Sequence, residues 1–322
     1  MDRRRFVALI GGALAAQLVL AQQARRVYRM AWPAVGSRPG LEHLIAALEQ
    51  GLRDLGHVPG KDIVVEFRSA EGKRERYQEV LQEVVRSKPD VIVTATNDST
   101  TALKVATQSI PIVMAVGTDV IAAGFAMSLA KPGGNITGIT WDVGAGTAIK
   151  RLELLKEIAP RISRIAVYGE SVFKDQYQAP IDAAGSVLGV RTFWHDFSGD
   201  PELDFAEMMR LRAEAVYVRA AGVIMNRRAE IIALAAKHRL PTSFPVSEFV
   251  VAGGLMSYGP SLAGSFRSAA RHVDKILKGT KPGDIPIEQP SVIDLSINLK
   301  TAKALGLTIP QTVLLRANRV IE

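Results

Sequence analysis

The sequence predicts an α/β protein made of two lobes, each a doubly wound parallel sheet, joined by a hinge that the chain crosses three times. Short apolar runs alternate with amphipathic segments from residue 27 onward, which is the pattern of βαβ units around parallel sheets. This series starts again near residue 148, after a segment rich in glycine and proline. The length of 322 residues also suits two domains of about 100–200 residues each.

Residues 1–21 are expected to be an export signal rather than part of either lobe. The cationic start Arg3-Arg4-Arg5 precedes an apolar run from Phe6 to Leu20, and Ala21 is a small residue at the expected cleavage position. The arginines followed by phenylalanine are also similar to a twin-arginine signal. An apolar helix packed on the body and an uncleaved membrane anchor are the alternatives. We expect cleavage after Ala21 and export to the periplasm.

The first lobe is expected to comprise residues 22–140 together with about 260–290. The β-branched run Val91-Ile92-Val93 is typical of a strand buried on both faces of a parallel sheet. A helical apolar stripe begins at Leu41 and ends before Gly56, a residue type that can adopt the left-handed conformation that stops a helix. The strands are predicted at 27–35, 63–67, 91–93, 111–116 and 136–141, and the helices at 41–55, 77–85, 99–107 and 262–277.

The second lobe is expected to comprise residues 141–259 together with about 291–322. Asp200 and Pro201 predict the start of a helix, and Asn298 predicts the cap of another helix that Gly306 ends. Segments rich in proline and glycine near 132–146, 259–263 and 281–290 predict the joints between the lobes. The strands are predicted at 165–168, 190–197, 215–220, 241–245, 255–258 and 291–297, and further helices at 148–158, 179–188 and 223–238.

The composition argues against several function classes. The sequence has no cysteine, which excludes disulfides, thiol nucleophiles and cysteine-based zinc sites. The five histidines have no metal-ligand spacing, and the chain lacks the motifs of serine hydrolases, zinc proteases and P-loop proteins. The net charge of +8 would become +6 without residues 1–21, and its lysines and arginines are spread along the chain. We therefore expect no catalytic residues, metal or cofactor, and no nucleic-acid partner.

Candidate ligand residues lie in loops at the carboxyl ends of the predicted strands, where open parallel sheets bind ligands. Thr96, Asn97 and Ser99 open a helix directly after a buried strand, and hydroxyls with helix N–H groups can hold an anion. Ordinary helix capping is the alternative for these side chains. Asp119 follows the next strand and could neutralise a ligand amine, or could cap the segment after it.

Aromatic side chains at the ends of strands are further candidates. Trp32, Trp141, Tyr168 and Tyr258 could stack on the apolar body of a ligand, although packing in the core or hinge is the alternative for each. The remaining candidates lie in the loops at the same strand ends, and they are Ser37, Glu170, Ala220 and Asn226.

Four stretches of the sequence resemble the solute-binding proteins of ABC transporters, in the branch that includes tryptophan- and tyrosine-type receptors. They are the leader Arg3-Arg4-Arg5-Phe6, the segment Ser128–Gly138, the turn Gly254–Gly259 and the ending, made of Glu288–Pro290 with Ile297–Leu307. The resemblance implies a type 1 periplasmic-binding fold that closes around a ligand and delivers it to a membrane permease. By position, it implies ligand loops at Asn97, Ser99 and Asp119 in one lobe and at Glu170, Ala220 and Tyr258 in the other.

The sequence therefore predicts a monomeric periplasmic receptor that captures a small amino-acid-like or carboxylate ligand, without turnover, for an ABC permease. An exported α/β enzyme acting on a small metabolite is the alternative function. A third alternative is the effector domain of a sugar-type repressor, but a DNA-binding segment would then be expected where the export signal lies.

Overall fold

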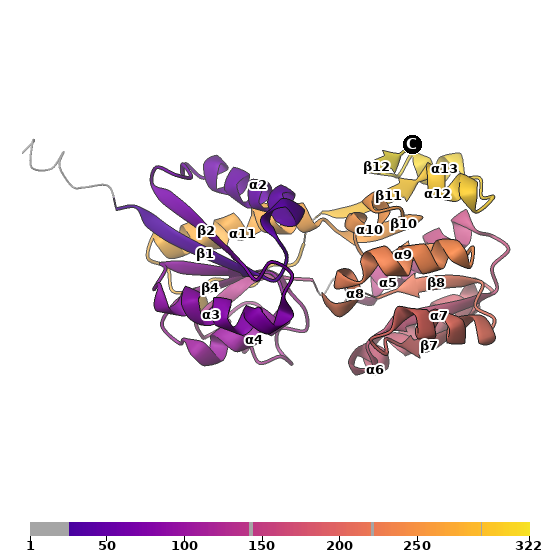
Figure 1. The fold of residues 1–322 in the computed structure, drawn as a ribbon, viewed down its shortest axis with the longest axis horizontal. Coiled ribbons are helices and arrows are strands. Elements are labelled where there is room, and N and C mark those ends of the chain that lie inside the picture. The colour runs from indigo at the N-terminus through magenta and orange to yellow at the C-terminus, as the bar shows by residue number, and fades with distance from the viewer. Residues whose placement is uncertain (1–25, 142–143, 220–221, 291) are drawn as a thin grey trace, which may run out of the picture.

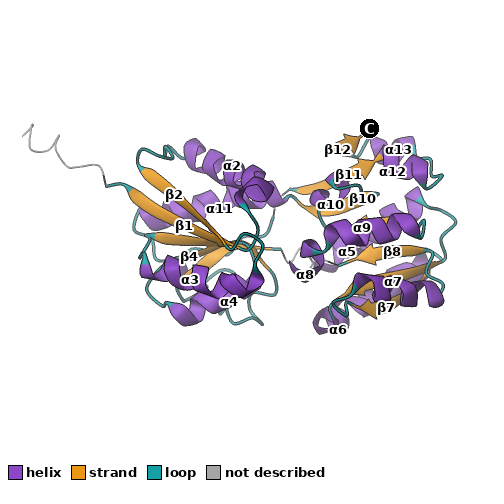
Figure 2. Cartoon of the chain, viewed as in Figure 1, coloured by secondary structure: helices purple, strands orange, loops and turns teal. Residues whose placement is uncertain are grey.

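The computed structural model describes residues 26–141, 144–219, 222–290 and 292–322. Two separate β-sheets lie side by side along the length of the molecule, and helices cover both faces of each (Figures 1 and 2). This arrangement confirms the predicted α/β fold of two lobes. The predicted signal and its cleavage position lie outside the described residues.

The first sheet has five strands, all paired in parallel, in the order β2-β1-β3-β4-β5. Successive residues of β1 alternate between its two faces: Met30 and Trp32 pack under α2 and α11, whereas Ala31 packs with side chains of α3 and α4. The strands are β1 (Tyr28–Ala34), β2 (Ile63–Ser69), β3 (Val91–Thr94), β4 (Ile112–Gly117) and β5 (Ile136–Thr140), and the helices are α2 (Arg38–Asp54), η1 (Arg74–Arg76), α3 (Tyr77–Arg86), α4 (Asn97–Ala106) and α11 (Leu262–Leu277).

Helix α11 returns to the first lobe after the chain has built most of the second. It packs along α2, where Gly51 allows a close approach: a Cβ built on Gly51 would lie 2.4 Å from the carbonyl oxygen of Arg267. The following 3-10 helix η3 (Pro282–Asp284) lies against β5. We therefore propose that residues 260–290 fold with 22–140, and that 291–322 fold with 141–259.

The second sheet has seven strands in the order β12-β11-β10-β9-β8-β6-β7. Its β10–β11 pair is antiparallel, which corrects the prediction of a wholly parallel sheet. The reason is the path of the chain: β10 runs toward the first lobe, and β11 enters from that lobe and therefore runs away from it. The strands are β6 (Arg164–Gly169), β7 (Arg191–Asp196), β8 (Ala215–Val218), β9 (Thr242–Phe244), β10 (Met256–Pro260), β11 (Ile293–Asn298) and β12 (Arg319–Ile321).

The helices of the second lobe pack on two cores, one on each face of its sheet. The single helix predicted at 223–238 is wrong, because Arg227 has φ −103° and ψ 15° and separates α8 from α9. The short elements α10, α13 and β12 were not predicted from the sequence. The helices are α5 (Gly144–Ile158), η2 (Ser171–Phe173), α6 (Lys174–Val187), α7 (Pro201–Arg210), α8 (Gly222–Asn226), α9 (Arg228–Lys237), α10 (Ser247–Val251), α12 (Leu299–Ala304) and α13 (Gln311–Leu314).

Local signals at helix ends behave as the sequence predicts. Asp200 accepts hydrogen bonds from the backbone N–H groups of Glu202 and Leu203 at the start of α7. Asn298 accepts one from Thr301 N at the start of α12, and Gly306 follows that helix with φ +72°. Side-chain caps and left-handed glycines therefore fix where these helices begin and end.

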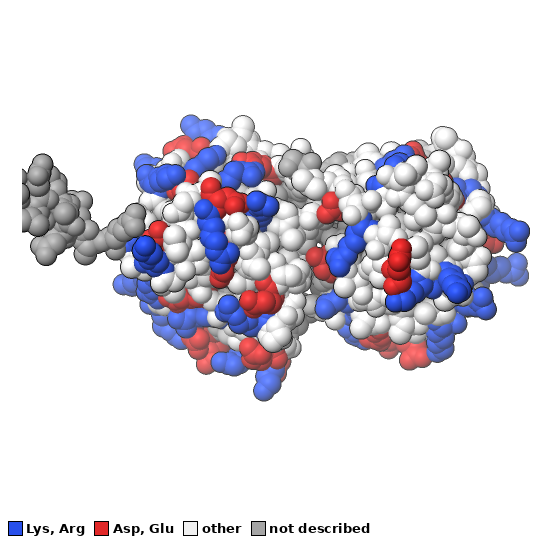
Figure 3. Space-filling model, turned by 90° about the horizontal axis from the view of Figure 1, so that it is seen from above, with Lys and Arg blue, Asp and Glu red and all other residues white. Residues whose placement is uncertain are grey.

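The carboxyl ends of the parallel strands of the two sheets face each other. The chain leaves β5 at Thr140 and continues into α5 of the second lobe, and it leaves β10 at Pro260 directly into the capping residue Ser261 of α11. Parallel neighbours of β5 and β10 end at these same edges. The molecule is constricted between the lobes, and positive and negative side chains are interspersed on the face shown in Figure 3.

Candidate functional site

The loops after β3 and β4 are joined by the side chain of Asn97. Its Nδ2 donates to the carbonyl oxygen of Thr118 (2.6 Å), and its Oδ1 accepts from Thr118 N (3.0 Å). Asp119 follows in the left-handed region, with φ +50°. The structure thus brings Asn97 and Asp119 together at the edge of the first sheet that faces the second lobe, as expected for loops that follow neighbouring parallel strands.

The hydroxyls near Asn97 serve mainly to cap α4. Thr96 Oγ1 accepts from Ser99 N (3.2 Å), and Ser99 Oγ donates to the Thr96 carbonyl (2.8 Å). Ser99 is only 1% exposed, so the prediction that it contacts a ligand is wrong for this conformation, and the capping alternative accounts for it. Thr96 is exposed at the same edge.

Two of the predicted aromatic contacts lie in the cores instead. Trp32 is 1% exposed, and its ring centroid lies 4.5 Å from that of Phe266. Tyr168 is fully buried, and its hydroxyl donates to Oδ2 of Asp204 (2.7 Å). The prediction that Trp32 and Tyr168 stack on a ligand is corrected, because both side chains point into the layers beneath the strand ends.

The two other aromatic candidates lie beside the crossings between the lobes. Trp141 packs against a core of the second lobe, while its Nε1 donates to Oγ of Ser265 in α11 on the first lobe (2.9 Å). Tyr258 is half-buried on β10 and pairs with Leu295 of the antiparallel strand. Hinge packing therefore accounts for Trp141.

Among the described residues, a histidine–carboxylate contact joins the two lobes directly. His43 Nε2 of α2 lies 3.7 Å from Oε1 of Glu248 in α10, and both helices follow strands that end at the facing edges. The His43 side chain is about half exposed, so this pair lies on the surface of the constriction. It contributes little to stability by itself.

Two arginines near the carboxyl end of β8 are not among the ligand residues predicted from the sequence, although Arg219 lies in a strand-end loop of the kind expected to bind a ligand. Arg219 directly follows β8, and its backbone N–H donates to the Tyr168 carbonyl (2.8 Å). Its guanidinium carbon lies 3.4 Å from the ring centroid of Tyr177. Arg151 of α5 lies below it, 5% exposed, and donates to the carbonyl of Val218.

A signal for Arg151 was present in the sequence. It occupies a position in the apolar stripe formed by Ala148, Leu152 and Leu155, where a solvated arginine is not expected. An arginine within a buried stripe predicts a buried cation, and buried cations are concentrated at functional sites.

The remaining predicted residues lie around the same constriction. Glu170 follows β6 and is half-buried, and Asn226 is exposed as the last residue of α8. Ser37 precedes α2 without a side-chain capping bond, and Ala220 lies outside the described residues.

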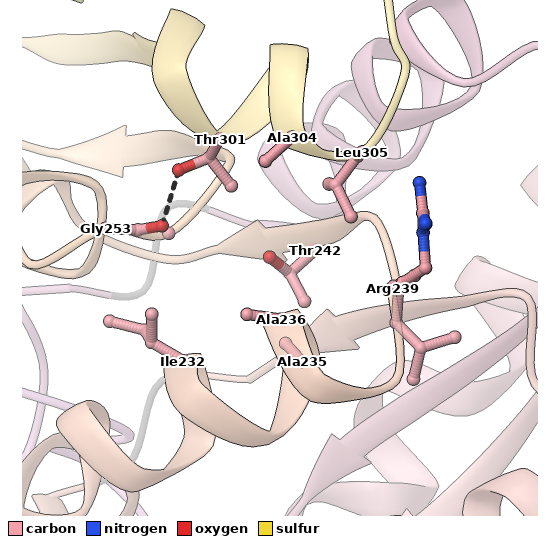
Figure 4. Close-up of a pocket in the computed structure, with 11 residues that line it drawn as sticks. Ile232, Ala235, Ala236, Arg239, Thr242, Gly253, Thr301, Ala304 and Leu305 are labelled. Carbon is pink, nitrogen blue, oxygen red and sulfur yellow. Dashed lines mark hydrogen bonds between the residues drawn. The ribbon is translucent and has the colours of Figure 1, made fainter.

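A small cavity lies elsewhere, between α9, α12 and the start of β9 (Figure 4). It measures about 60 Å³, and a hydrogen bond from Thr301 Oγ1 to the Gly253 carbonyl (2.8 Å) lies at its rim. Ligand pockets are usually about 300–1,000 Å³, so this cavity is too small for an amino acid. Thr242, which lines the cavity, is the first residue of β9. The cavity therefore lies at the amino end of the strand, away from the sheet edges that face each other.

The described residues show neither a metal-like cluster nor a membrane span. No group of three or more histidine, cysteine or acidic side chains could hold a metal ion within residues 26–141, 144–219, 222–290 and 292–322. Within the same ranges, no helix is both long enough and apolar enough to cross a bilayer.

Comparisons of the sequence with known proteins find proteins that bind small molecules. The sequence model of a family described as ABC transporter substrate binding protein matches residues 33–321. A tyrosine-binding protein of Clostridioides difficile is 26% identical over 274 residues, which cover 84% of this chain and 78% of that protein.

Solved structures share the fold. An ABC domain from Streptococcus pneumoniae in complex with L-Trp matches with a TM-score of 0.79 and 24% identity, over 92% of this chain and 100% of that one. The ligand-free, open structure of a substrate-binding protein with adhesive properties from Clostridium difficile matches with a TM-score of 0.69 and 23% identity, over 92% and 99% of the two chains.

Proposed function

Because the chain belongs to the family of ABC transporter substrate-binding proteins, we propose that it is the periplasmic receptor of an ABC importer. It captures a small amino-acid-like or carboxylate ligand between its lobes and delivers it to a membrane permease. The observation that supports this proposal best is that the parallel strands of the two sheets face each other with their carboxyl ends, where ligands of open α/β sheets bind.

The names of similar proteins narrow the ligand class. One relative is named for tyrosine, and one structural neighbour holds L-Trp. For this chain we propose an amino acid with an apolar or aromatic body, bound by the Asn97–Asp119 edge of one lobe and the Glu170–Tyr258 edge of the other. Trp141, which contacts both lobes, lies where closure would bend the chain.

Binding without chemistry is part of the proposal. Closure around the ligand shifts the population of lobe arrangements, and the permease would respond to the closed form. We propose that the protein works as a monomer in the periplasm after export and cleavage after Ala21.

The test is a thermal-shift screen of the chain from residue 22 against amino acids, aromatic acids, nucleosides and sugars, followed by calorimetry. L-tyrosine or L-tryptophan should raise the melting temperature, and the ligand should be recovered unchanged by mass spectrometry. Asn97→Ala and Asp119→Ala should bind more weakly. A protein that converts its ligand would be an exported enzyme, and one that ignores every amino acid and carboxylate would contradict the proposed ligand class.

A further inference from the structure

We infer that the ligand's carboxylate binds to the second lobe, on Arg219 with Arg151 behind it. This inference depends on the proposed function, because it assigns one part of the ligand to one edge of the constriction. It differs from the sequence-based expectation that an anion would bind at the start of α4 in the first lobe.

Arg219 is held at the edge of the second sheet that faces the first lobe, and its guanidinium N–H groups have no partner within the described residues. A Cβ built on Gly169 at the end of β6 would lie 2.8 Å from Cβ of Arg219, so the glycine makes room for the arginine stem. The Tyr177 ring covers one face of the guanidinium at 3.4 Å. Across the described chain, the Arg219 side chain makes no hydrogen bond or ion pair, and its Nε is buried. The edge of its guanidinium is therefore available to a ligand.

Arg151 adds a second cation from beneath. Its guanidinium carbon lies 3.7 Å from the ring centroid of Tyr217, its Nε is buried without a partner, and the side chain is 5% exposed. Burial, with the charge of Arg219 adding to it, lowers the pKa of Arg151 to about 10. The group is thus still protonated at neutral pH, and its charge interacts with that of Arg219.

Within the described residues the two arginines lack a counter-ion, in contrast to Arg29, Arg68 and Arg227, each of which pairs with a glutamate. Arg29, for example, lies 2.7 Å from Glu66. Neither Arg151 nor Arg219 has a carboxylate within 4.0 Å in the described part of the chain, and this includes Glu170 beside Gly169. A buried charge without a partner is unfavourable, whereas a carboxylate fits the guanidinium in a bidentate pair. A bound carboxylate would supply the missing counter-ion.

The experiment compares acids with their amides by calorimetry at pH 7, using L-tyrosine with L-tyrosinamide and L-tryptophan with L-tryptophanamide. The wild-type protein should prefer each acid over its amide. Arg219→Gln should weaken binding of the acid at least about tenfold, the loss expected for a hydrogen bond between charged groups, and should leave the amide unchanged. Arg219→Lys should keep part of the preference for the acid over the amide, because lysine keeps the positive charge but cannot form the two parallel hydrogen bonds of a guanidinium.

Two further variants separate a ligand site from a structural role. Arg161→Gln makes the same charge change at an exposed position before β6, on the opposite edge of the sheet, and should bind both ligands as the wild type does. Arg151→Met should raise the melting temperature of the ligand-free protein, because it removes an unpaired buried charge, and should weaken acid binding. If Arg151→Met does not fold, the Arg219 series alone decides.

The outcomes distinguish this inference from the function on which it depends. If Arg219→Gln binds the acids as tightly as the wild type, or if the wild type binds amides as tightly as acids, the carboxylate site is wrong and the receptor function stands. If the wild type binds none of the amino acids or carboxylates in the screen, both proposals are overturned.

Discussion

Replacing Tyr168 with phenylalanine separates a core role from a ligand role at this position. The substitution keeps the ring and removes the hydroxyl that donates to Asp204 Oδ2 at 2.7 Å. Both residues are buried, with Tyr168 at 0% and Asp204 at 3% exposure. Burial and the adjacent carboxylate raise the pKa of Tyr168, so its hydroxyl remains a donor at neutral pH.

The structure sets the size of the effect. Without the tyrosine, Asp204 keeps a bond from Ser198 N (3.1 Å) and a longer contact of 3.4 Å with His195 Nε2. A hydrogen bond to a charged group contributes roughly 1.5–3 kcal/mol. With a urea m-value of about 2 kcal/mol/M, a loss of about 2 kcal/mol lowers the unfolding midpoint of the second lobe by about 1 M.

Urea titration followed by circular dichroism measures this midpoint, and calorimetry measures ligand affinity in the same variant. Tyr217→Phe is the matched control, because Tyr217 lies on the neighbouring strand and donates to a neutral carbonyl, that of Ala148, at 3.2 Å. Its loss should be only about 0.5–1.5 kcal/mol. Neither variant should change ligand affinity. A Tyr168→Phe protein of unchanged stability and weakened ligand binding would refute the assignment of Tyr168 to the core.

Three other changes test the packing between elements. Gly51→Ala should destabilise the protein by about 1–3 kcal/mol, because the new methyl group meets the Arg267 carbonyl; an unchanged melting temperature would show that α2 and α11 separate easily. Trp141→Phe removes the 2.9 Å hydrogen bond to Ser265 and should change ligand affinity, measured by calorimetry, by no more than about tenfold; a larger change would show that Trp141 does more than make one ordinary hydrogen bond. Burial lowers the pKa of His272 below its unfolded value near 6.5, so stability should fall as the pH drops below about 6.5, and thermal melts at pH 7 and pH 5 should differ less in His272→Gln. Equal pH dependence in wild type and variant would contradict this role.

Most of the fold follows from apolar patterns in the sequence. The run Val91-Ile92-Val93 is a buried strand, and the stripe from Leu41 ends at a helix stop, as their residues predict. Elements such as Gln311–Leu314 and Arg319–Ile321 are too short to show a period. The antiparallel direction of β11 depends on the earlier path of the chain to the other lobe, which no local pattern contains.

The candidate site was only partly predictable for a different reason. Side chains near the end of a strand point alternately to the two faces of the sheet. The sequence therefore does not distinguish an aromatic residue that borders a ligand from one that a helix covers, as for Trp32 and Tyr168. Their burial depends on α11 and α7, which come from distant parts of the sequence. Asn97 and Asp119 were predictable because their loops follow strands that are neighbours in the sheet.

The strand β11 follows β10 in the sequence only after α11 and η3, so β10 lacks this neighbour during part of the chain's synthesis. Until residues 293–298 are available, one edge of β10 has no neighbour and presents unpaired backbone N–H and C=O groups. Such an edge can pair with another incomplete chain, and a polypeptide emerging in order from its amino end exposes it for the whole time that α11 and the loop after it are being synthesised. Premature termination between β10 and β11 would therefore leave a second lobe whose β10 has an unpaired edge. Such truncated chains should aggregate rather than accumulate in soluble form.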